Sequence, residues 1–374
     1  MSRMPRILCG LTVGSLAAVS LLLGASQCAK QRDRTKDFVV EQQADLSRLA
    51  VVAAARSYLL GIDTTTFRVE ARIRCSEIQF DKLARLPDGG VLVVDEAYGR
   101  RHRIYRLDPD CSLRASAPVP GDPPTPFVHG NLVLMGAGYF SSGDVPVQVY
   151  RLDDFTHLTT FRVEGSLIRQ EFFCAQGDRI FFPYVHAIEN SNQGTAYPVM
   201  LDAKTLNFTH LYEGTPREWT KADEFVSVAS GDSLIMIPIM RCHPVIFDVA
   251  MRRTLAQRDL GEEMKARVGR SHGTVSQPVV HNGMLYAIYA WSNPRTVCWM
   301  KIRLSDLTLL EAKQVLQQSG AWYAGDDFHT FGRYYIIETN QPIGKIFTAT
   351  FIDWRTGAIV GQCTVNDLSF KHLK

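Results

Sequence analysis

The side chains of this 374-residue chain that could take part in catalysis lie in a few polar segments. Asp326 and Asp327 are adjacent, and His329 follows two residues later. Adjacent carboxylates beside an imidazole could hold a cation or act as general acid and base, although a solvated turn has the same composition. The remaining candidate catalytic residues are of the same kinds and lie in other polar segments: Glu224, His186 and His272.

A second group of side chains suits the recognition of a polar ligand. Aromatic rings stack on sugars and peptide groups, while charged and imidazole side chains orient a bound polar molecule. The candidate ligand-binding residues are Trp219, Trp291, Arg295, Trp322, Tyr323, His243 and Glu189. Any one of them could be an ordinary solvated residue, so the expectation depends on the collection.

Several motifs of well-known chemistries are absent from the sequence. There is no HExxH, no P-loop and no GxSxG, and the Gly-Ala-Gly at 136–138 lies inside a strand pattern with no helix after it. The cysteines form no CxxC pair, so a zinc ribbon or a thioredoxin-like motif is disfavoured. We therefore expect no metal and no cofactor.

The polar segments lie between the halves of a phrase that recurs six times. Its first half is a Gly turn followed by an apolar run, at 87–94, 129–135, 176–182, 230–236, 282–288 and 331–337. Its second half is an apolar run that ends in a polar turn, at Asp108, Asp153, Asp202, Asp248, Ser305 and Asp353. These ends are 45 to 57 residues apart, a period typical of propeller blades.

Each repeat is expected to form one sheet of four antiparallel strands. Gly gives the first hairpin its backbone freedom, and Asp stabilises the second turn by bonding its own backbone. No repeat has a convincing helical pattern, so the sequence predicts an all-β, six-bladed β-propeller over residues 76–374. Before it, residues 44–75 are expected to form a short helix that starts at Asp45 and reaches Leu60, and an alternating strand over 65–73.

The segment LPDGGVLVVDEAYGRRHRIYRLDPDCSL at 86–113 resembles the blades of NHL and TolB-like six-bladed propellers. Later repeats depart from that pattern at Ser305, and only the last has the full DWRTG turn, at Asp353. The resemblance implies that the Gly and Asp turns share one face and that the candidate residues above share the other, around the channel. The longest segments of that second face, 185–197 and 261–275, are expected to act as lids.

The N-terminus has the order of regions that an export signal needs. Arg3 and Arg6 precede an apolar stretch from 7 to 23 and then small residues, which predicts a signal peptide over 1–26 and a flexible tether over 27–43. Cys28 resembles the acylated cysteine of bacterial lipoproteins, although the box before it is degraded. Lipid attachment at Cys28 and simple cleavage near Ser26 both stay open, and the expected location is the periplasm or a lipid-anchored position on a membrane.

The net charge limits the classes of partner that the protein could bind, and the cysteine positions limit the possible disulfides. The formal charge of +3 falls to +1 without the two leader arginines, so nucleic acid binding has little support, and membrane contact is expected only through Cys28. Cys75 and Cys111 flank the first repeat and are the first pair to test for a disulfide. More often, scattered cysteines are small core hydrophobes.

The function expected from the sequence is that of a binding module of the cell envelope, with a glycan, a peptide or an envelope protein as partner. The alternative is a periplasmic enzyme of the lactonase, lyase or glycosidase kind, with its site at the channel mouth. A third possibility is a structural envelope component, which would present a broad apolar patch.

Overall fold

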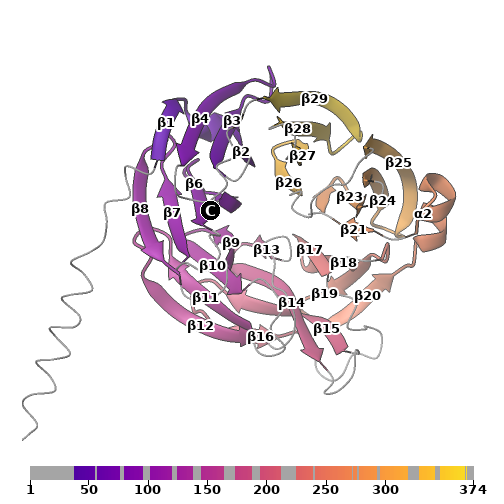
Figure 1. Ribbon diagram of the computed structural model, residues 1–374. Coiled ribbons are helices and arrows are strands. Elements are labelled where there is room, and N and C mark those ends of the chain that lie inside the picture. The colour runs from indigo at the N-terminus through magenta and orange to yellow at the C-terminus, as the bar shows by residue number, and fades with distance from the viewer. Residues whose placement is uncertain are drawn as a thin grey trace, which may run out of the picture.

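The chain forms a ring of seven antiparallel sheets, as the computed structural model shows (Figure 1). It describes residues 38–54, 57–75, 80–95, 102–119, 124–137, 145–163, 173–187, 194–211, 225–238, 241–271, 273–275, 278–292, 295–318, 328–341, 346–366 and 368. The prediction of an all-β propeller with four antiparallel strands per blade is confirmed. The prediction of six blades is wrong, because the ring has seven.

The first three blades use the N-terminal part of the described chain. Blade 1 contains β2 (Ala50–Ala54), β3 (Tyr58–Ile62), β4 (Val69–Cys75) and, on its outer side, β1 (Phe38–Gln42). Blade 2 contains β5 (Phe80–Arg85), β6 (Val91–Asp95), β7 (Arg103–Leu107) and β8 (Leu113–Pro118). Blade 3 contains β9 (Pro124–His129), β10 (Leu132–Ala137), β11 (Val145–Arg151) and β12 (His157–Val163).

The other four blades complete the ring. Blade 4 contains β13 (Cys174–Gln176), β14 (Arg179–Ala187), β15 (Gly194–Asp202) and β16 (Phe208–His210), and blade 5 contains β17 (Phe225–Ser230), β18 (Ser233–Pro238), β19 (Val245–Asp248) and β20 (Arg253–Gln257). Blade 6 contains β21 (Thr274–Val275) and β22 (Val279–His281), which both pair with β23 (Met284–Ser292), then β24 (Arg295–Arg303) and β25 (Thr308–Gln318). Blade 7 contains β26 (Phe328–Phe331), β27 (Tyr334–Gln341), β28 (Ile346–Asp353) and β29 (Ala358–Val365).

The inner strands are apolar on both faces because each sheet is covered by two neighbours. In β6, Val91 and Val93 pack against blade 1, while the alternate residues Leu92 and Val94 pack against blade 3. A strand covered on both faces shows no polar alternation. This is why the repeats have continuous apolar runs such as residues 91–94.

The turns that carry the acidic residues have a common design. Asp202 accepts hydrogen bonds from the backbone N–H groups of Lys204 and Thr205 at 2.9 and 2.7 Å, which holds the pKa of its carboxyl below the usual range. Each such turn then has one residue with left-handed backbone: Phe67, Cys111, Phe155, Leu206, Arg252, Leu307 and Gly357, with φ from 50 to 71°. We name this end of the ring the turn face.

Most of these left-handed residues are apolar and pack against the preceding blade. Cys111 packs against blade 1, Phe155 against blade 2 and Leu307 against blade 5. Left-handed backbone costs about 1–2 kcal/mol for a residue other than Gly. The burial of an apolar side chain between two sheets offsets that cost.

The seam between blade 7 and blade 1 closes the ring. Phe67 of blade 1 reaches blade 7, where its ring centroid lies 5.2 Å from that of Phe351 and 6.5 Å from that of Tyr334. Gly361 makes room, because a Cβ there would overlap the Phe67 ring. Ring closure therefore uses the same side-to-side packing as the other seams.

Blade 1 is where the sequence-based interpretation was wrong. The apolar stretch expected as a helix from Asp45 to Leu60 forms one 3₁₀ turn over 46–48 and then β2 and β3. Asp45 does cap that turn, but β2 and β3 are buried on both faces, and such runs cannot be told from a buried helix by periodicity. The alternating strand is present as β4, and residues 38–42 of the expected tether form β1.

The missed repeat left a signal in the sequence. Asp63 ends the run LLGID, 45 residues before Asp108, and accepts hydrogen bonds from Thr65 and Thr66 as the other turn aspartates do. No Gly turn precedes its strand β2, which follows the 3₁₀ turn over 46–48 instead. Without the Gly half of the phrase, this blade did not match the repeat.

The chain direction of blade 1 also differs. The segment before β2 lies on the turn face of blade 2, where Leu46 N–H donates to Pro109 O at 2.8 Å, so β2 starts at the turn face. In the other blades the innermost strand ends at that face, as β5 does before the Gly89 turn. β2 therefore runs like the second strand of another blade, and β1 is added outside β4.

A helix was not expected between the repeats, but α2 (Gly261–Val268) follows blade 5. Glu262 and Glu263 lie in its first turn, and Gly269 ends it with a φ of 75°. Arg267 donates to the carbonyls of Leu309 and Leu310 at 2.8 and 2.7 Å, which fixes α2 beside β25 on the outside of the ring (Figure 1). Part of the segment 261–275, which was expected to be a lid, is thus held by the scaffold.

We predict that Phe67→Ala weakens the fold at its seam. Loss of the ring removes contacts with Phe351 and Tyr334, so the free energy of unfolding should fall by about 2–4 kcal/mol in a urea titration. Arg252→Ala is the matched control, since Arg252 has the same left-handed position but is exposed, and should change stability by less than about 0.5 kcal/mol. Equal effects of the two variants would contradict the role of Phe67 in closure.

Candidate functional site

Buried polar side chains collect toward the end of the ring opposite the turn face. We name that end the loop face, because the segments that join second to third strands leave the sheets there. Nine polar or charged residues of the described chain are buried, and six are in the loop-face half of their strands or beside it: Asp95, His102, Ser227, Thr296, Glu338 and Thr339. All six have interaction partners, which offsets the cost of burying polar groups at this end of the ring.

Asp95 and His102 lie at the loop-face end of blade 2, where β6 ends and β7 begins. Asp95 is the last residue of β6 and pairs with Arg103, and its side chain is on the same side of the sheet as Val91 and Val93, which face blade 1. The Nδ1 atom of His102 lies 3.0 Å from the backbone oxygen of Asp95. That contact fixes the imidazole across the opening of the β6–β7 strand pair.

Glu338 brings a second buried carboxyl toward blade 1 from the opposite side. In β27, Ile336 packs in the seam with blade 1 and Ile337 in the seam with blade 6, so alternation puts Glu338 on the blade 1 side. Asp95 and Glu338 are 2% and 4% exposed. Two buried carboxyls thus flank blade 1 at its loop-face half.

Trp291 anchors the seam between blades 5 and 6 at the same end. Its ring packs on Gly273, where a Cβ would lie 2.8 Å from the ring, and the Arg270 guanidinium is 5.8 Å from the ring centroid. Trp291 is only 8% exposed. The structure therefore gives this ring a packing role, and stacking on a ligand stays a prediction.

A phenol and two sulfur atoms are buried below Trp291. The Tyr289 hydroxyl donates to Arg241 O at 3.0 Å, and Cys242 Sγ lies 3.7 Å from Met300 Sδ. Burial raises the pKa of the Cys242 thiol to about 12 and raises that of Tyr289 well above its usual value. Neither group has the ionised form that a nucleophile needs at neutral pH.

The six described cysteines are free thiols. Cys75 and Cys111, the first candidate pair for a disulfide, are both buried in the core between blades 1 and 2. Cys111 donates to Ala44 O at 3.3 Å, and burial raises the pKa of its thiol. The reading of these cysteines as small core hydrophobes is therefore the one that the structure favours.

Most of the candidate site residues lie outside the described residues, so their predictions stay untested. They are Asp326, Asp327, Glu224, His272, Trp219, Trp322, Tyr323, Glu189 and the lipid-attachment candidate Cys28. His186 pairs with Thr195 in β14, and Arg295 with Ser292 in β24, both at the loop-face ends of their strands. His243 is half-buried beside Cys242.

Sequence reasoning missed Asp95 and Glu338 and named His102 only as part of a loop. Each carboxyl follows an uninterrupted apolar run, VLVV before Asp95 and YYII before Glu338. An acid at the end of a strand that is apolar on both faces is the signal that could have found them.

The carboxyl groups at the turn face are held by hydrogen bonds within turns and caps. Eight aspartates have a pKa below the usual range, all of them in turns or caps: Asp45, Asp63, Asp88, Asp110, Asp154, Asp202, Asp306 and Asp353. At Asp353, burial acts to raise the pKa, but hydrogen bonds from Arg333 and the Arg355 N–H outweigh it. These groups are fixed as ionised structural acceptors.

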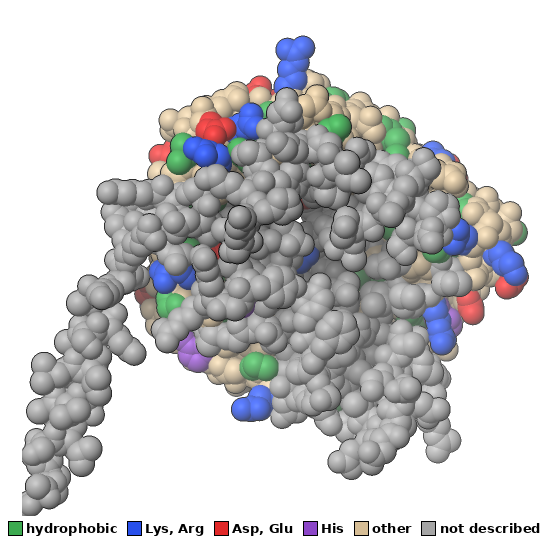
Figure 2. Space-filling model, viewed as in Figure 1, with side chains coloured by type: hydrophobic (Ala, Val, Ile, Leu, Met, Phe, Trp, Pro, Cys, Tyr) green, Lys and Arg blue, Asp and Glu red, His purple; other side chains and the backbone are tan. Residues whose placement is uncertain are grey.

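The described part of the chain lacks two classes of feature. It contains no group of three or more His, Cys, Asp or Glu side chains that could hold a metal ion. None of its helices has the length and apolarity that a membrane span requires. Among its side chains visible in Figure 2, basic and acidic groups are both scattered around the rim of the ring.

Comparison with known proteins supports the fold alone. No protein-family model and no curated protein matches the sequence. A protein of unknown function from Desulfotomaculum acetoxidans is similar in structure, with 12% identity, a TM-score of 0.54 and coverage of 84% of this chain and 97% of that one. KlAtg21, solved with the coiled coil of AgAtg16, gives 11% identity, a TM-score of 0.54 and coverage of 88% and 99%.

We predict that the core thiols of the native protein are almost inert. Burial raises the pKa values of Cys174, Cys242 and Cys298 to about 12, so about one thiol in 10,000 is ionised at pH 8. Iodoacetamide should label these positions at least about 100-fold faster after denaturation than before, as measured by peptide mass spectrometry. Comparable rates in the two states would show that the thiols are accessible and ionised.

Proposed function

We propose that this chain is an exported or lipid-anchored β-propeller of the cell envelope that binds a glycan, a peptide or an envelope protein at its loop face. The collection of buried polar side chains at that end carries the proposal. The turn face is closed by its own hydrogen bonds and by packing between blades. At the loop face, by contrast, the strands bury the polar side chains of Asp95, His102 and Glu338.

The scaffold under the loop face suits recognition. Each blade is held by neighbours on both sides, so groups at strand ends are supported by rigid elements. Loops on such a scaffold can vary without loss of the core. A near-neutral mature chain fits partners recognised by stacking and hydrogen bonds, rather than partners held by a general electrostatic field.

We prefer binding to the enzymatic alternative because the thiols and carboxyls with shifted pKa values are not arranged as nucleophiles or as general acids and bases. The three thiols with the largest pKa shifts are protonated at neutral pH, and the eight aspartates with resolved shifts are bound in turns or caps. A lactonase-, lyase- or glycosidase-like activity would depend on Asp326, Asp327, Glu224, His186 and His272. That alternative has no support from a described contact.

We expect loop-face aromatic residues to determine ligand binding. Purified protein should retain a ligand on a glycan array, a peptide array or an envelope-protein pull-down, and Trp322→Ala or Trp219→Ala should weaken binding by at least about tenfold, because a stacked ring contributes about 1–3 kcal/mol. Met251→Ala is the control, since Met251 is exposed on the turn face. Unchanged binding by both tryptophan variants would reject the loop face as the site.

Export and lipid attachment are tested at Cys28. Mass spectrometry of the mature protein should find a diacylated or triacylated Cys28 if the anchor exists, and Cys28→Ser should release the protein from the membrane fraction without changing its folded core. An unmodified N-terminus near Ser26 would leave export but remove the anchor. Retention of residues 1–26 in the mature protein would contradict export.

A further inference from the structure

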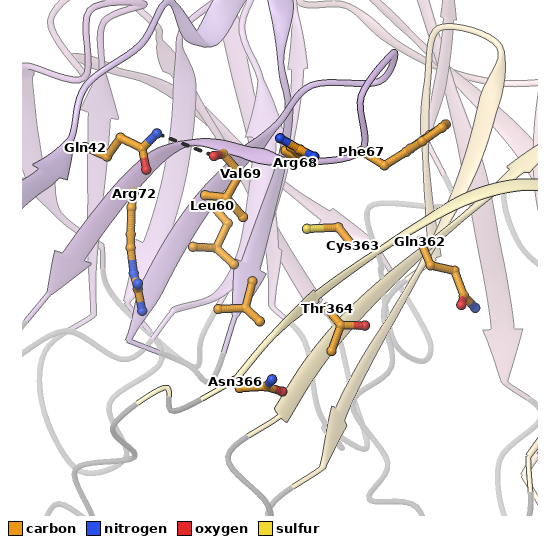
Figure 3. A pocket seen from close by; sticks show the side chains of 11 residues that line it. Gln42, Leu60, Phe67, Arg68, Val69, Arg72, Gln362, Cys363, Thr364 and Asn366 are labelled. Atoms are coloured by element: carbon orange, nitrogen blue, oxygen red, sulfur yellow. Dashed lines mark hydrogen bonds between the residues drawn. The ribbon is translucent and has the colours of Figure 1, made fainter.

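A polar groove lies at the seam between blade 7 and blade 1, on the outer side of the ring. Its volume is about 520 Å³, and β29 forms one wall while β4, β3 and the end of β1 form the other (Figure 3). That size is within the range of sites for small molecules. No residue named so far as a site candidate lines it.

The groove exists because the seam is filled unevenly. At the turn-face end, Phe67 packs into the space above Gly361. Further along, β29 presents the small side chain of Cys363 to the blade 1 wall, and Cys363 points toward that wall in Figure 3. Short side chains on one wall cannot reach the other, so the sheets leave an open space there.

The lining is basic and contains no acid. Arg68 and Arg72 come from blade 1, and the other polar lining residues are Gln42, Gln362, Thr364 and Asn366. Two acids of the described chain lie beside the lining: Glu41, which is shared by Arg72 and Arg74 at 3.2 and 2.8 Å, and Asp63, whose backbone N–H donates to Arg68 O at 2.9 Å. Glu70 is exposed on β4 and does not line the groove. Positive charge exceeds negative charge among the lining residues.

Arg72 is held in place before any ligand arrives. Its guanidinium lies 5.0 Å from the centroid of the buried Tyr58 ring, and Glu41 approaches it closest at Nε. That Nε is buried and makes no hydrogen bond of good geometry with the described residues. A guanidinium fixed by stacking loses little entropy on binding and presents a planar fork that matches a carboxylate.

We propose that this groove binds a small carboxylate-bearing molecule with hydroxyl or amide groups, of the size of an acidic sugar or an acidic dipeptide. Arg72 and Arg68 bind the carboxylate. Gln42 and Asn366 supply donors and acceptors for the rest of the molecule, and Val69 contacts its apolar parts. None of the candidate residues of the loop face lines this site, which does not depend on the function proposed above.

The test uses the purified protein and isothermal titration with two carboxylate probes, galacturonate and glutamyl-glutamate, with galactose as the neutral control. We expect one carboxylate probe to bind saturably and to bind at least about tenfold more tightly than galactose, and which one binds identifies the source of the ligand. Absence of saturable binding of both up to about 10 mM would overturn the proposal.

Arginine variants distinguish direct contact of Arg72 with the carboxylate from a general electrostatic attraction to the basic surface. Arg72→Gln should weaken binding by at least about tenfold and Arg72→Lys by less, because lysine keeps the charge but not the fork. Arg74→Gln is the matched control, since Arg74 also pairs with Glu41 but does not line the groove, and it should change affinity by less than about threefold. Equal losses in Arg72→Gln and Arg74→Gln would sink the assignment.

Two further measurements keep the result unambiguous. If Arg72→Gln does not fold, as judged by its melting temperature, Arg68→Gln replaces it, because Arg68 is exposed and should also weaken binding severalfold. The loop-face variant Trp322→Ala should bind the carboxylate probe like the wild type. If Trp322→Ala lost binding of the carboxylate probe, the probe would be bound at the loop face, and the groove would be rejected as the site.

Discussion

Each sheet of this ring has two apolar faces, and both must be covered. A single sheet cannot meet that requirement, and a row of sheets would leave two faces in water at its ends. Closing the row into a ring removes those ends. The packing of blade 7 against blade 1, with Leu368 buried in the same cluster, is thus the contact on which the burial of all the other sheets depends.

The same requirement explains the left-handed residues of the turn face. The turn must bring the chain back to the outer strand and also fill the crevice between two sheets. An apolar residue such as Phe155 or Leu307 does both, at a cost in backbone energy. Blade 7 has Gly357 there, and the Trp299 ring of blade 6 fills the space that a side chain would take. One position thus joins local geometry to packing between blades.

Function is expected where the regular packing ends. At the loop face, strands stop being wholly apolar and bury Asp95 and Glu338 on either side of blade 1. At the outer part of the closing seam, a small-residue wall meets an arginine wall and leaves a polar groove. Both features lie next to blade 1, the blade whose strand order and direction differ from those of the others.

The sequence by itself determined the repeat and the antiparallel strands of blades 2 to 7, because Gly turns, Asp turns and apolar runs act within about 50 residues of chain. It also located the turn aspartates, whose hydrogen bonds are local. It could not determine the number of blades, since blade 1 lacks the Gly half of the phrase and its runs at 50–54 and 58–62 fit a buried helix equally well. Only the tertiary structure decided that these runs are strands, that Trp291 is packed, and that Arg72 and Cys363, far apart in sequence, share a groove. Those outcomes depend on which sheet lies beside which, and that is fixed by closure of the whole ring.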